Sequence, residues 1–296
     1  MIYLKHSGSK PVAVLIDGQP LEFQFQNQAV SAACFLLAEK FPDETLIWFH
    51  ENVEHNLNLE FIQNLSSELE MLSYAAKQPL AIAEEMGFVD QSVFFRIQHE
   101  VKYPTWLMSS AVGSVSCKAL LHFKKYIPAY PEFDLFLCVL AKAGMPKGLR
   151  LYSEPRLIKN PAENAVSFSK NLNTTYTIIA DLMGAKWLLL FELQRLLYQK
   201  KLNILRLLKS IQIKRINSTA IPELPIDTPE LEKVKEELSF DVIIPTLGRK
   251  QVLKQTLDDL SSQILVPQCV ILIEQNPEVN AVSELDYLQT ESWPFQ

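Results

Sequence analysis

Glycine is scarce in this chain: 8 of its 296 residues are glycine, less than half the average frequency of ~7%. Neither G-x-G-x-x-G nor G-x-x-x-x-G-K-[ST] occurs in the sequence. These glycine-rich loops let the backbone approach a phosphate group closely. Their absence excludes the usual dinucleotide-binding and P-loop sites, so any phosphate ligand must be held in another way.

Paired cysteines are also lacking. The four cysteines, Cys34, Cys117, Cys138 and Cys269, form no C-x-x-C pair and stand mostly between apolar residues. This pattern argues against a disulfide framework. We predict free thiols, mostly buried, in a protein of a reducing compartment.

No hydrophobic run is long enough to cross a membrane. The longest uncharged stretches, residues 23–38 and 103–117, fall short of the ~18–20 residues of a spanning helix. The N-terminus lacks the apolar segment of a secretion signal. We therefore expect a cytoplasmic protein.

Acidic residues are almost missing from residues 186–215, which carry 8 basic side chains and 1 acidic one. The rest of the chain is acidic, and the formal net charge is −6. The basic block lacks interleaved surface aromatics and a known nucleic-acid-binding module, so we expect no nucleic acid as a partner.

What is present is ordinary for a globular protein: 48% hydrophobic and 21% charged residues, in a length that fits about two domains. Up to about residue 160, short apolar runs alternate with helical patterns, which predicts an α/β domain. We predict strands at 11–17, 45–49, 93–101 and 149–152, helices at 26–40, 61–72 and 133–143, and a turn running into a helix within 113–126.

The remaining chain divides into three parts. Helix-forming sequence is nearly continuous over 177–213, prolines interrupt 217–239, and a new strand begins at Phe240. We place the boundaries at 1–165 for the α/β domain, 166–216 for a basic helical segment, 217–239 for a linker with a short charged helix, and 240–296 for a second module.

The helical segment has two interpretations. Its apolar side chains form one hydrophobic face that covers the first domain, or the segment lies on anionic lipid through Trp187, Phe191 and its Lys and Arg residues, at the inner face of the membrane. The face in question comprises Leu182, Leu189, Leu193, Leu196, Leu197, Ile204 and Leu208.

The most specific motif lies at 240–276, where an apolar strand ending at Pro245 turns through Thr246-Leu247-Gly248-Arg249 into a helix. That helix turns Val252, Leu253, Leu257 and Leu260 inward, and a second strand ends at Glu274. A turn that follows a strand of a parallel sheet lies at the carboxyl edge, where α/β proteins bind ligands.

This stretch resembles the opening of the family 2 glycosyltransferases, which have the GT-A fold. In that family an apolar strand ends in a Pro-Thr-type turn, the next helix commonly ends in Gln, here Gln263, and the second strand carries a carboxylate. The resemblance implies that Pro245, Thr246 and Arg249 lie near the nucleotide of a UDP-sugar type donor. Glu274 takes the acidic position, where Asp is more usual.

The first domain is similar to a degenerate copy of the later half of that fold. Residues 25–52 have its layout of helix, strand and acidic cluster, but His50-Glu51-Asn52 replaces the metal-binding D-x-D. The resemblance implies Mn²⁺ or Mg²⁺ as cofactor, with Glu51 as the remaining carboxylate ligand.

Residues 113–144 are similar to the acceptor-side segment of the family. The resemblance puts Glu132 and Asp134 where the family keeps acidic residues, one of them the general base. Side chains at i and i+2 point to different faces of a helix, so at most one can act. The alternative is that Asp134 caps the following helix and Glu132 is solvated.

The fold class we expect is therefore α/β, with a GT-A-like mixed sheet flanked by helices, then a helical segment and a partial second βαβ unit. The implied activity is inverting transfer of a sugar from a nucleotide-sugar to a saccharide or lipid-linked acceptor. We expect little turnover, because no complete set of metal and base residues is present. The alternative is a non-catalytic accessory module of polysaccharide biosynthesis.

Overall fold

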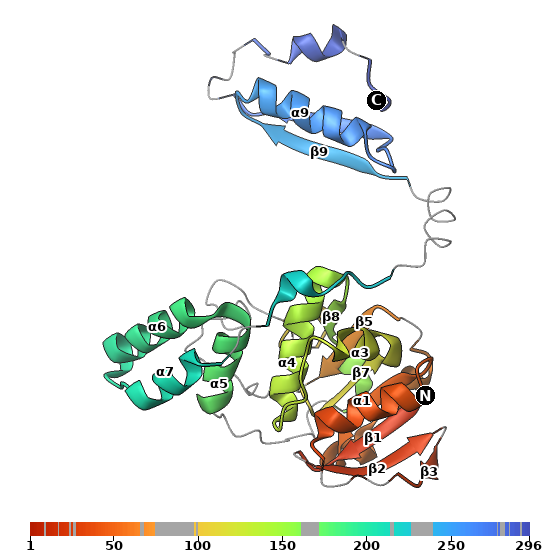
Figure 1. Cartoon of the computed structure of the whole chain (residues 1–296). Helices are drawn as coiled ribbons and strands as arrows, with labels where there is room; N and C mark the ends of the chain where they lie inside the picture. The colour runs from red at the N-terminus through yellow and green to blue at the C-terminus, as the bar shows by residue number, and fades with distance from the viewer. Residues whose placement is uncertain are drawn as a thin grey trace. The chain divides into compact units, whose positions relative to one another are not determined.

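The computed structural model describes the chain except for residues 9, 17, 24, 26–27, 66–67, 75–97, 99, 161–171, 214–215, 226–238, 277, 279–281, 284 and 291. The chain forms two compact units, Met1–Leu224 and Pro225–Gln296 (Figure 1). The first unit contains both the α/β region and the basic helical segment.

A mixed eight-stranded sheet forms the centre of the first unit, in the order β3-β2-β1-β4-β7-β5-β8-β6. Its strands are β1 Ile2–His6, β2 Pro11–Ile16, β3 Gln19–Leu21, β4 Thr45–His50, β5 Glu70–Tyr74, β6 Tyr103–Pro104, β7 Val112–Ser116 and β8 Arg150–Ser153. The pairs β1/β4 and β5/β8 are parallel, and the other pairs are antiparallel.

Both faces of the sheet are covered. Leu4, Leu46 and Trp48 belong to the cluster that α1 (Val30–Lys40), α3 (Cys117–Lys124) and α4 (Phe133–Gly144) bury. The alternate residues Tyr3 and Phe49 pack on the opposite face. Strands buried on both faces have near-continuous apolar sequence, as TLIWF does at 45–49.

Short helices complete the second face and the α4–β8 region. They are the 3₁₀ helix η1 Glu51–Asn56, α2 Leu59–Gln63, and the 3₁₀ turns η4 Met145–Lys147 and η5 Pro155–Leu157. The cysteines of this unit, Cys34, Cys117 and Cys138, are buried and free, and Cys269 in the second unit is free and half-buried. The prediction of free thiols is confirmed.

Two local predictions for this unit were wrong. The helix expected at 61–72 ends at Gln63, and Glu70–Tyr74 forms β5, because Met71 and Leu72 are buried on opposite faces of the sheet between β7 and β8. Gly113 lies in β7 and not in a turn: a Cβ there would stand 2.2 Å from the Trp48 ring. The strand β1 was not predicted, and the strand expected at 93–101 falls largely outside the described residues.

The basic segment folds into a helical lobe and not into one continuous helix. Its elements are α5 Leu172–Ile178, the π-helical turn η7 Ile179–Met183, α6 Ala185–Gln194, the π-helical turn η8 Arg195–Gln199 and α7 Ile204–Ile211. The chain turns at Gly184 (φ 90°) and Lys200 (φ 54°). The small core of the lobe contains Tyr176, Leu188 and Phe191.

The hydrophobic face predicted to cover the first domain does not do so. Of its seven residues only Leu182 packs against the main core. The other six are exposed, from 43% at Leu196 to 63% at Leu197. Phe191, expected in the lipid-facing alternative, is instead 5% exposed in the lobe core. The lobe buries the opposite side of α6, so the predicted face remains outside.

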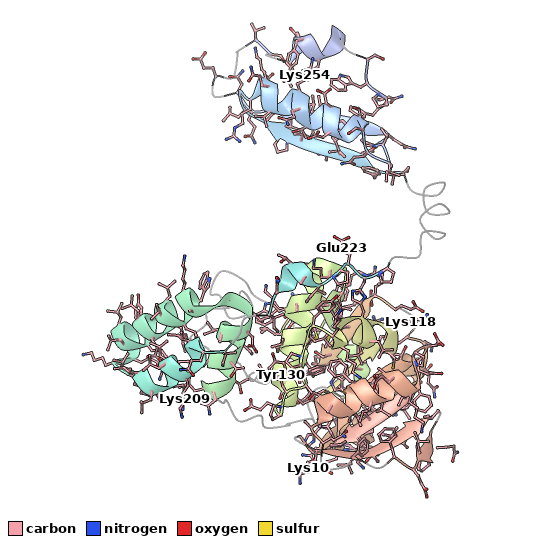
Figure 2. The ribbon with its side chains drawn as sticks, viewed as in Figure 1. Lys10, Lys118, Tyr130, Lys209, Glu223 and Lys254 are labelled. Atoms are coloured by element: carbon pink, nitrogen blue, oxygen red, sulfur yellow. The ribbon has the colours of Figure 1, made fainter. Side chains whose placement is uncertain are left out.

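The lobe joins the α/β region through polar contacts beside α4. The Tyr130 hydroxyl donates to Asp181 Oδ2 at 2.7 Å, and the Thr174 hydroxyl donates to Glu132 (Tyr130 is labelled in Figure 2). The start of the predicted linker also packs here: Ile221 and Leu224 are buried in the main core, next to the 3₁₀ turn η9 Ser218–Ala220. The short charged helix expected in the linker lies outside the described residues.

The second unit is a strand–helix–strand motif. It consists of β9 Asp241–Thr246, α9 Lys250–Ser261, β10 Cys269–Glu274 and the 3₁₀ helix η10 Asp286–Thr290. The two strands are parallel and in register, which confirms the predicted βαβ order. Leu253 and Leu257 are buried as predicted, but Val252 is 58% exposed.

Candidate functional site

Two histidines mark the carboxyl ends of the parallel strands β1 and β4. His6 and His50 are the last residues of these strands and are partners in the register. Their rings lie 5.4 Å apart in an edge-to-face arrangement, and the Phe133 ring at the start of α4 lies 5.2 Å from His6. The N-terminus of α4 thus reaches the edge of the sheet where α/β proteins place their ligands.

His6 is completely buried and held by the backbone on both ring nitrogens. Nε2 lies 2.8 Å from the carbonyl oxygen of Ser110, and Nδ1 accepts the N–H of Gly8 at 3.0 Å. Because Nδ1 is an acceptor, Nε2 carries the proton of a neutral imidazole. Burial lowers the pKa of His6 to about 4, so the ring is uncharged at neutral pH.

Ser110 connects His6 to Asp134. Its N–H donates to Asp134 Oδ1 at 2.7 Å, while its carbonyl faces His6. The loop that carries it is anchored by its neighbours: Ser109 accepts from Trp48 Nε1 at 3.0 Å, and its N–H donates to the Ser73 hydroxyl at 3.1 Å. One hydrogen-bonded loop therefore contacts both ionisable groups.

Asp134 has the properties of an acid–base group near neutral pH. Burial raises its pKa to about 6, opposed by the hydrogen bonds from Ser110 and reinforced by Glu132. A carboxyl group with a pKa close to the working pH can take up a proton from a substrate hydroxyl. The side chain is half-buried and not sealed from solvent.

The alternative interpretation of the acidic pair is right for one member: Glu132 is exposed to solvent as expected, but Asp134 does not cap the helix. Glu132 occupies the N-cap position of α4 without a capping hydrogen bond, and Asp134 bonds to Ser110. Glu132 accepts from Thr174 in the helical lobe. The two carboxylates thus serve different partners, in agreement with their i, i+2 spacing, and Asp134 is the one at the sheet edge.

Glu51 follows β4, at the position that the resemblance implies for a metal ligand. It is exposed at the start of η1, and the neighbouring His50 Nδ1 accepts the N–H of Asn52 at 3.2 Å. Burial lowers the pKa of His50, opposed by Glu51. Among the residues that the structure describes, no three His, Cys, Asp or Glu side chains are grouped to hold an ion.

The nucleotide-contact residues predicted in the second unit gather at one edge. Thr246 and Glu274 are register partners at the carboxyl ends of β9 and β10, and the N–H of Gln275 donates to the Thr246 carbonyl at 2.8 Å. Arg249 is exposed directly before α9, and Pro245 precedes Thr246 in the strand. The edge combines one hydroxyl, one guanidinium and one carboxylate.

A cavity of about 590 Å³ opens on the other face of the first unit's sheet. Its lining includes Tyr3, Leu15 and Phe49, which point away from His6 and Asp134. The carboxylate in its lining is Glu54, which is paired with Lys5 at 2.6 Å. This cavity offers apolar surface without an acid–base pair, so we place the chemistry at Asp134.

His6 and Ser110 were not recognised as site residues from the sequence. The structure shows His6 as a buried, hydrogen-bonded histidine. A signal existed in its place at the end of an apolar run, Ile2–Leu4, but nothing local connects residue 6 with residues 110 and 134.

The chain was compared with protein-family models, with curated proteins and with solved structures. None of the three comparisons gave a match.

Proposed function

We propose that this chain is a GT-A-like glycosyltransferase-type protein that binds a nucleotide-sugar and transfers the sugar slowly to a hydroxyl of a saccharide or lipid-linked acceptor. The observation that carries the proposal is Asp134, a carboxyl group with its pKa raised to about 6 at the carboxyl edge of β1 and β4. A general base for hydroxyl attack needs this combination of place and pKa.

Two arrangements support the assignment. In the first unit, α1 and β4 lead into His50-Glu51, and α4 brings Asp134 to the same edge, which is the layout that the family resemblance implies. In the second unit, Thr246, Arg249 and Glu274 lie at the ends of a parallel strand pair. Each arrangement stands within its own unit.

In the proposed reaction, Asp134 accepts the proton of the acceptor hydroxyl as its oxygen attacks the anomeric carbon. A new glycosidic C–O bond forms while the bond to the diphosphate breaks, and the nucleoside diphosphate leaves with the electron pair. Ser110 holds Oδ1 of Asp134, so Oδ2 is the oxygen that receives the proton.

The second candidate is a non-catalytic accessory module that binds the nucleotide-sugar without turnover. One observation favours it: Glu132, the other predicted acidic residue, is engaged with Thr174. Both candidates predict binding, and they differ in catalysis.

The test is titration of the full chain with UDP-glucose and UDP-N-acetylglucosamine in the presence of Mn²⁺, by calorimetry and by release of UDP. We expect nucleotide binding by the second unit itself to weaken about tenfold in Glu274→Gln and to be unaffected by Asp259→Asn, an exposed carboxylate of α9. We expect slow UDP release that rises as the pH passes about 6 and is lost in Asp134→Asn, with binding retained.

Binding without release, or release unchanged in Asp134→Asn, would favour the accessory module. Absence of binding to any nucleotide-sugar would remove both candidates.

A further inference from the structure

The helical lobe exposes an unusual number of large apolar side chains. Twelve residues between 187 and 211 are exposed, from 39% at Ile211 to 83% at Tyr198. They are Trp187, Leu189, Leu190, Leu193, Leu196, Leu197, Tyr198, Leu202, Ile204, Leu205, Leu208 and Ile211. We call this set the apolar lobe surface. Large exposed apolar patches mark interaction or membrane sites in soluble proteins.

The apolar lobe surface is not the core side of the helices. In α6 and η8 the inward positions are Leu188, Phe191, Glu192 and Arg195, all buried and spaced i, i+3, i+4 and i+7. These side chains pack around Tyr176, whose hydroxyl accepts from Arg195 Nη1 at 2.7 Å. The fold of the lobe is therefore complete without the outer residues.

The outer residues are apolar on both helices. In α6 they span most of the side opposite Leu188, and Trp187 and Leu190 line a groove of about 140 Å³. In α7, Ile204, Leu208 and Ile211 recur at i, i+4 and i+7 on one exposed face. Each of the two helices thus presents an apolar face outward, as helices that lie in a membrane interface do.

The charges within this surface have one sign. Lys186, Lys200, Lys201 and Lys209 are exposed (Lys209 is labelled in Figure 2). The single acidic residue of 185–213 is Glu192, which is 2% exposed and bonded to Arg195 at 2.9 Å. The exposed part of 185–213 thus carries cations and no carboxylate.

The position of the lysines favours contact of this surface with a layer of lipid headgroups. Lys200 and Lys201 form the turn between η8 and α7, flanked by Tyr198 and Leu202, which are 83% and 50% exposed. Lysine stems lie along apolar surface while their ammonium groups reach the headgroups, and Trp and Tyr rings favour the same interfacial depth. Basic residues next to an anionic leaflet add electrostatic attraction.

We propose that the apolar lobe surface binds an anionic lipid bilayer, with α6 and α7 lying in its interface. A second copy of this chain is a poorer partner, because a symmetric contact brings the same lysines together across the interface. None of the helices in the described part of the chain combines the length and apolar character that crossing a bilayer requires. The proposal goes beyond the proposed function and does not depend on it.

The experiment is co-sedimentation of the full chain with phosphatidylcholine vesicles, with and without 30% phosphatidylserine, at low and high salt. We expect binding to the anionic vesicles, several-fold weaker at high salt and at least tenfold weaker without phosphatidylserine. Lys200→Glu/Lys201→Glu and Leu197→Gln/Leu205→Gln should each reduce binding about tenfold. The matched controls Lys10→Glu/Lys159→Glu and Ile264→Gln/Val282→Gln change exposed residues elsewhere and should bind normally.

A second readout locates the contact. Brominated lipids should quench part of the tryptophan fluorescence, and Trp187→Phe should remove that quenching, because Trp187 is 56% exposed on the surface proposed to insert. Circular dichroism checks that each variant is folded. Three outcomes would overturn the proposal: no vesicle binding, equal binding to pure phosphatidylcholine, or self-association of the free chain that Leu197→Gln/Leu205→Gln abolishes.

Discussion

At the scale of single residues, Ser110 contacts both His6 and Asp134. The pKa of the histidine is lowered and the pKa of the carboxyl group is raised. Burial lowers the pKa of His6 from 6.5 to about 4 and raises that of Asp134 from 3.8 to about 6. Both shifts favour the neutral form, because removing either charge from water is unfavourable. As a result, the contributions of the two residues to the pH dependence of stability partly cancel.

The signs follow from proton linkage. Between about pH 4 and 6 the folded chain keeps a proton on Asp134 that the unfolded chain has lost, so this residue makes stability fall as the pH rises. From pH 6.5 down to about 4 the unfolded chain protonates His6 and the folded chain does not, so that residue makes stability fall as the pH drops.

We predict that Asp134→Asn is more stable than the parent at pH 8, by about 1–3 kcal/mol, because one pKa unit corresponds to about 1.4 kcal/mol and the side chain is only half-buried. Asn keeps an oxygen for the Ser110 N–H. Below pH 6 the variant should lose stability more steeply than the parent, because His6 is then unopposed.

Urea unfolding at pH 8, 6 and 4.5 measures this, with the exposed Asp258→Asn as control. If the free energy of unfolding of Asp134→Asn and of the parent changed with pH in the same way, burial would not be raising the pKa of Asp134.

At the scale of elements, the helical lobe is fixed to the α/β region by a few buried polar contacts beside α4. Tyr130 donates to Asp181 in η7, and the Asp181 backbone oxygen accepts the N–H of Ile216 at 2.9 Å. Asp181 is 4% exposed, and burial raises its pKa. An ionisable group buried to this degree depends on its hydrogen-bond partner.

We predict that Tyr130→Phe destabilises the first unit by about 1–3 kcal/mol, the usual loss when a buried polar group is left without its partner. The loss should be concentrated in α5 and η7, where amide hydrogen exchange should accelerate. Tyr198→Phe is the matched control, because Tyr198 is 83% exposed. Equal exchange rates in the two variants would mean that the Tyr130–Asp181 contact does not hold the lobe.

At the scale of the whole molecule, the chain consists of two units with separate cores. The first unit buries its main cluster around Trp48, Phe123 and Phe136, and the second buries Leu253, Leu257 and Leu288. The second unit leaves Ile243 and Ile271 exposed on its two-stranded sheet, at 61% and 46%. Separate cores of unequal size imply separate unfolding transitions.

We predict two transitions in calorimetry. Leu257→Ala should lower only the transition of the second unit, and Leu140→Ala only that of the first, each by about 2–5 kcal/mol, since Leu257 is 2% and Leu140 0% exposed. Hydrogen exchange followed by mass spectrometry assigns each transition to its residues. A single transition lowered equally by both variants would show that the two units unfold together.

Local pattern predicted the elements that depend on neighbours in the chain. The strands β4 and β10 and the helices α4 and α9 were expected within two residues of their observed bounds, because apolar period and turn residues are local signals. The same periodicity failed at 61–72. Its leucines fit a helix, but Glu70–Tyr74 pairs with both neighbouring strands, β7 and β8, and therefore forms the strand β5.

The amino-acid sequence by itself determined the absence of glycine-rich phosphate loops, the free thiols, the basic block and the βαβ unit at 240–276. Only the tertiary structure decided that His6, Ser110 and Asp134 meet, because the parallel pairing of β1 with β4 and the packing of α4 join residues far apart in the chain. It also decided that the leucines of 189–205 face outward. Periodicity shows which side chains share a helix face, whereas the partner surface determines which face is buried.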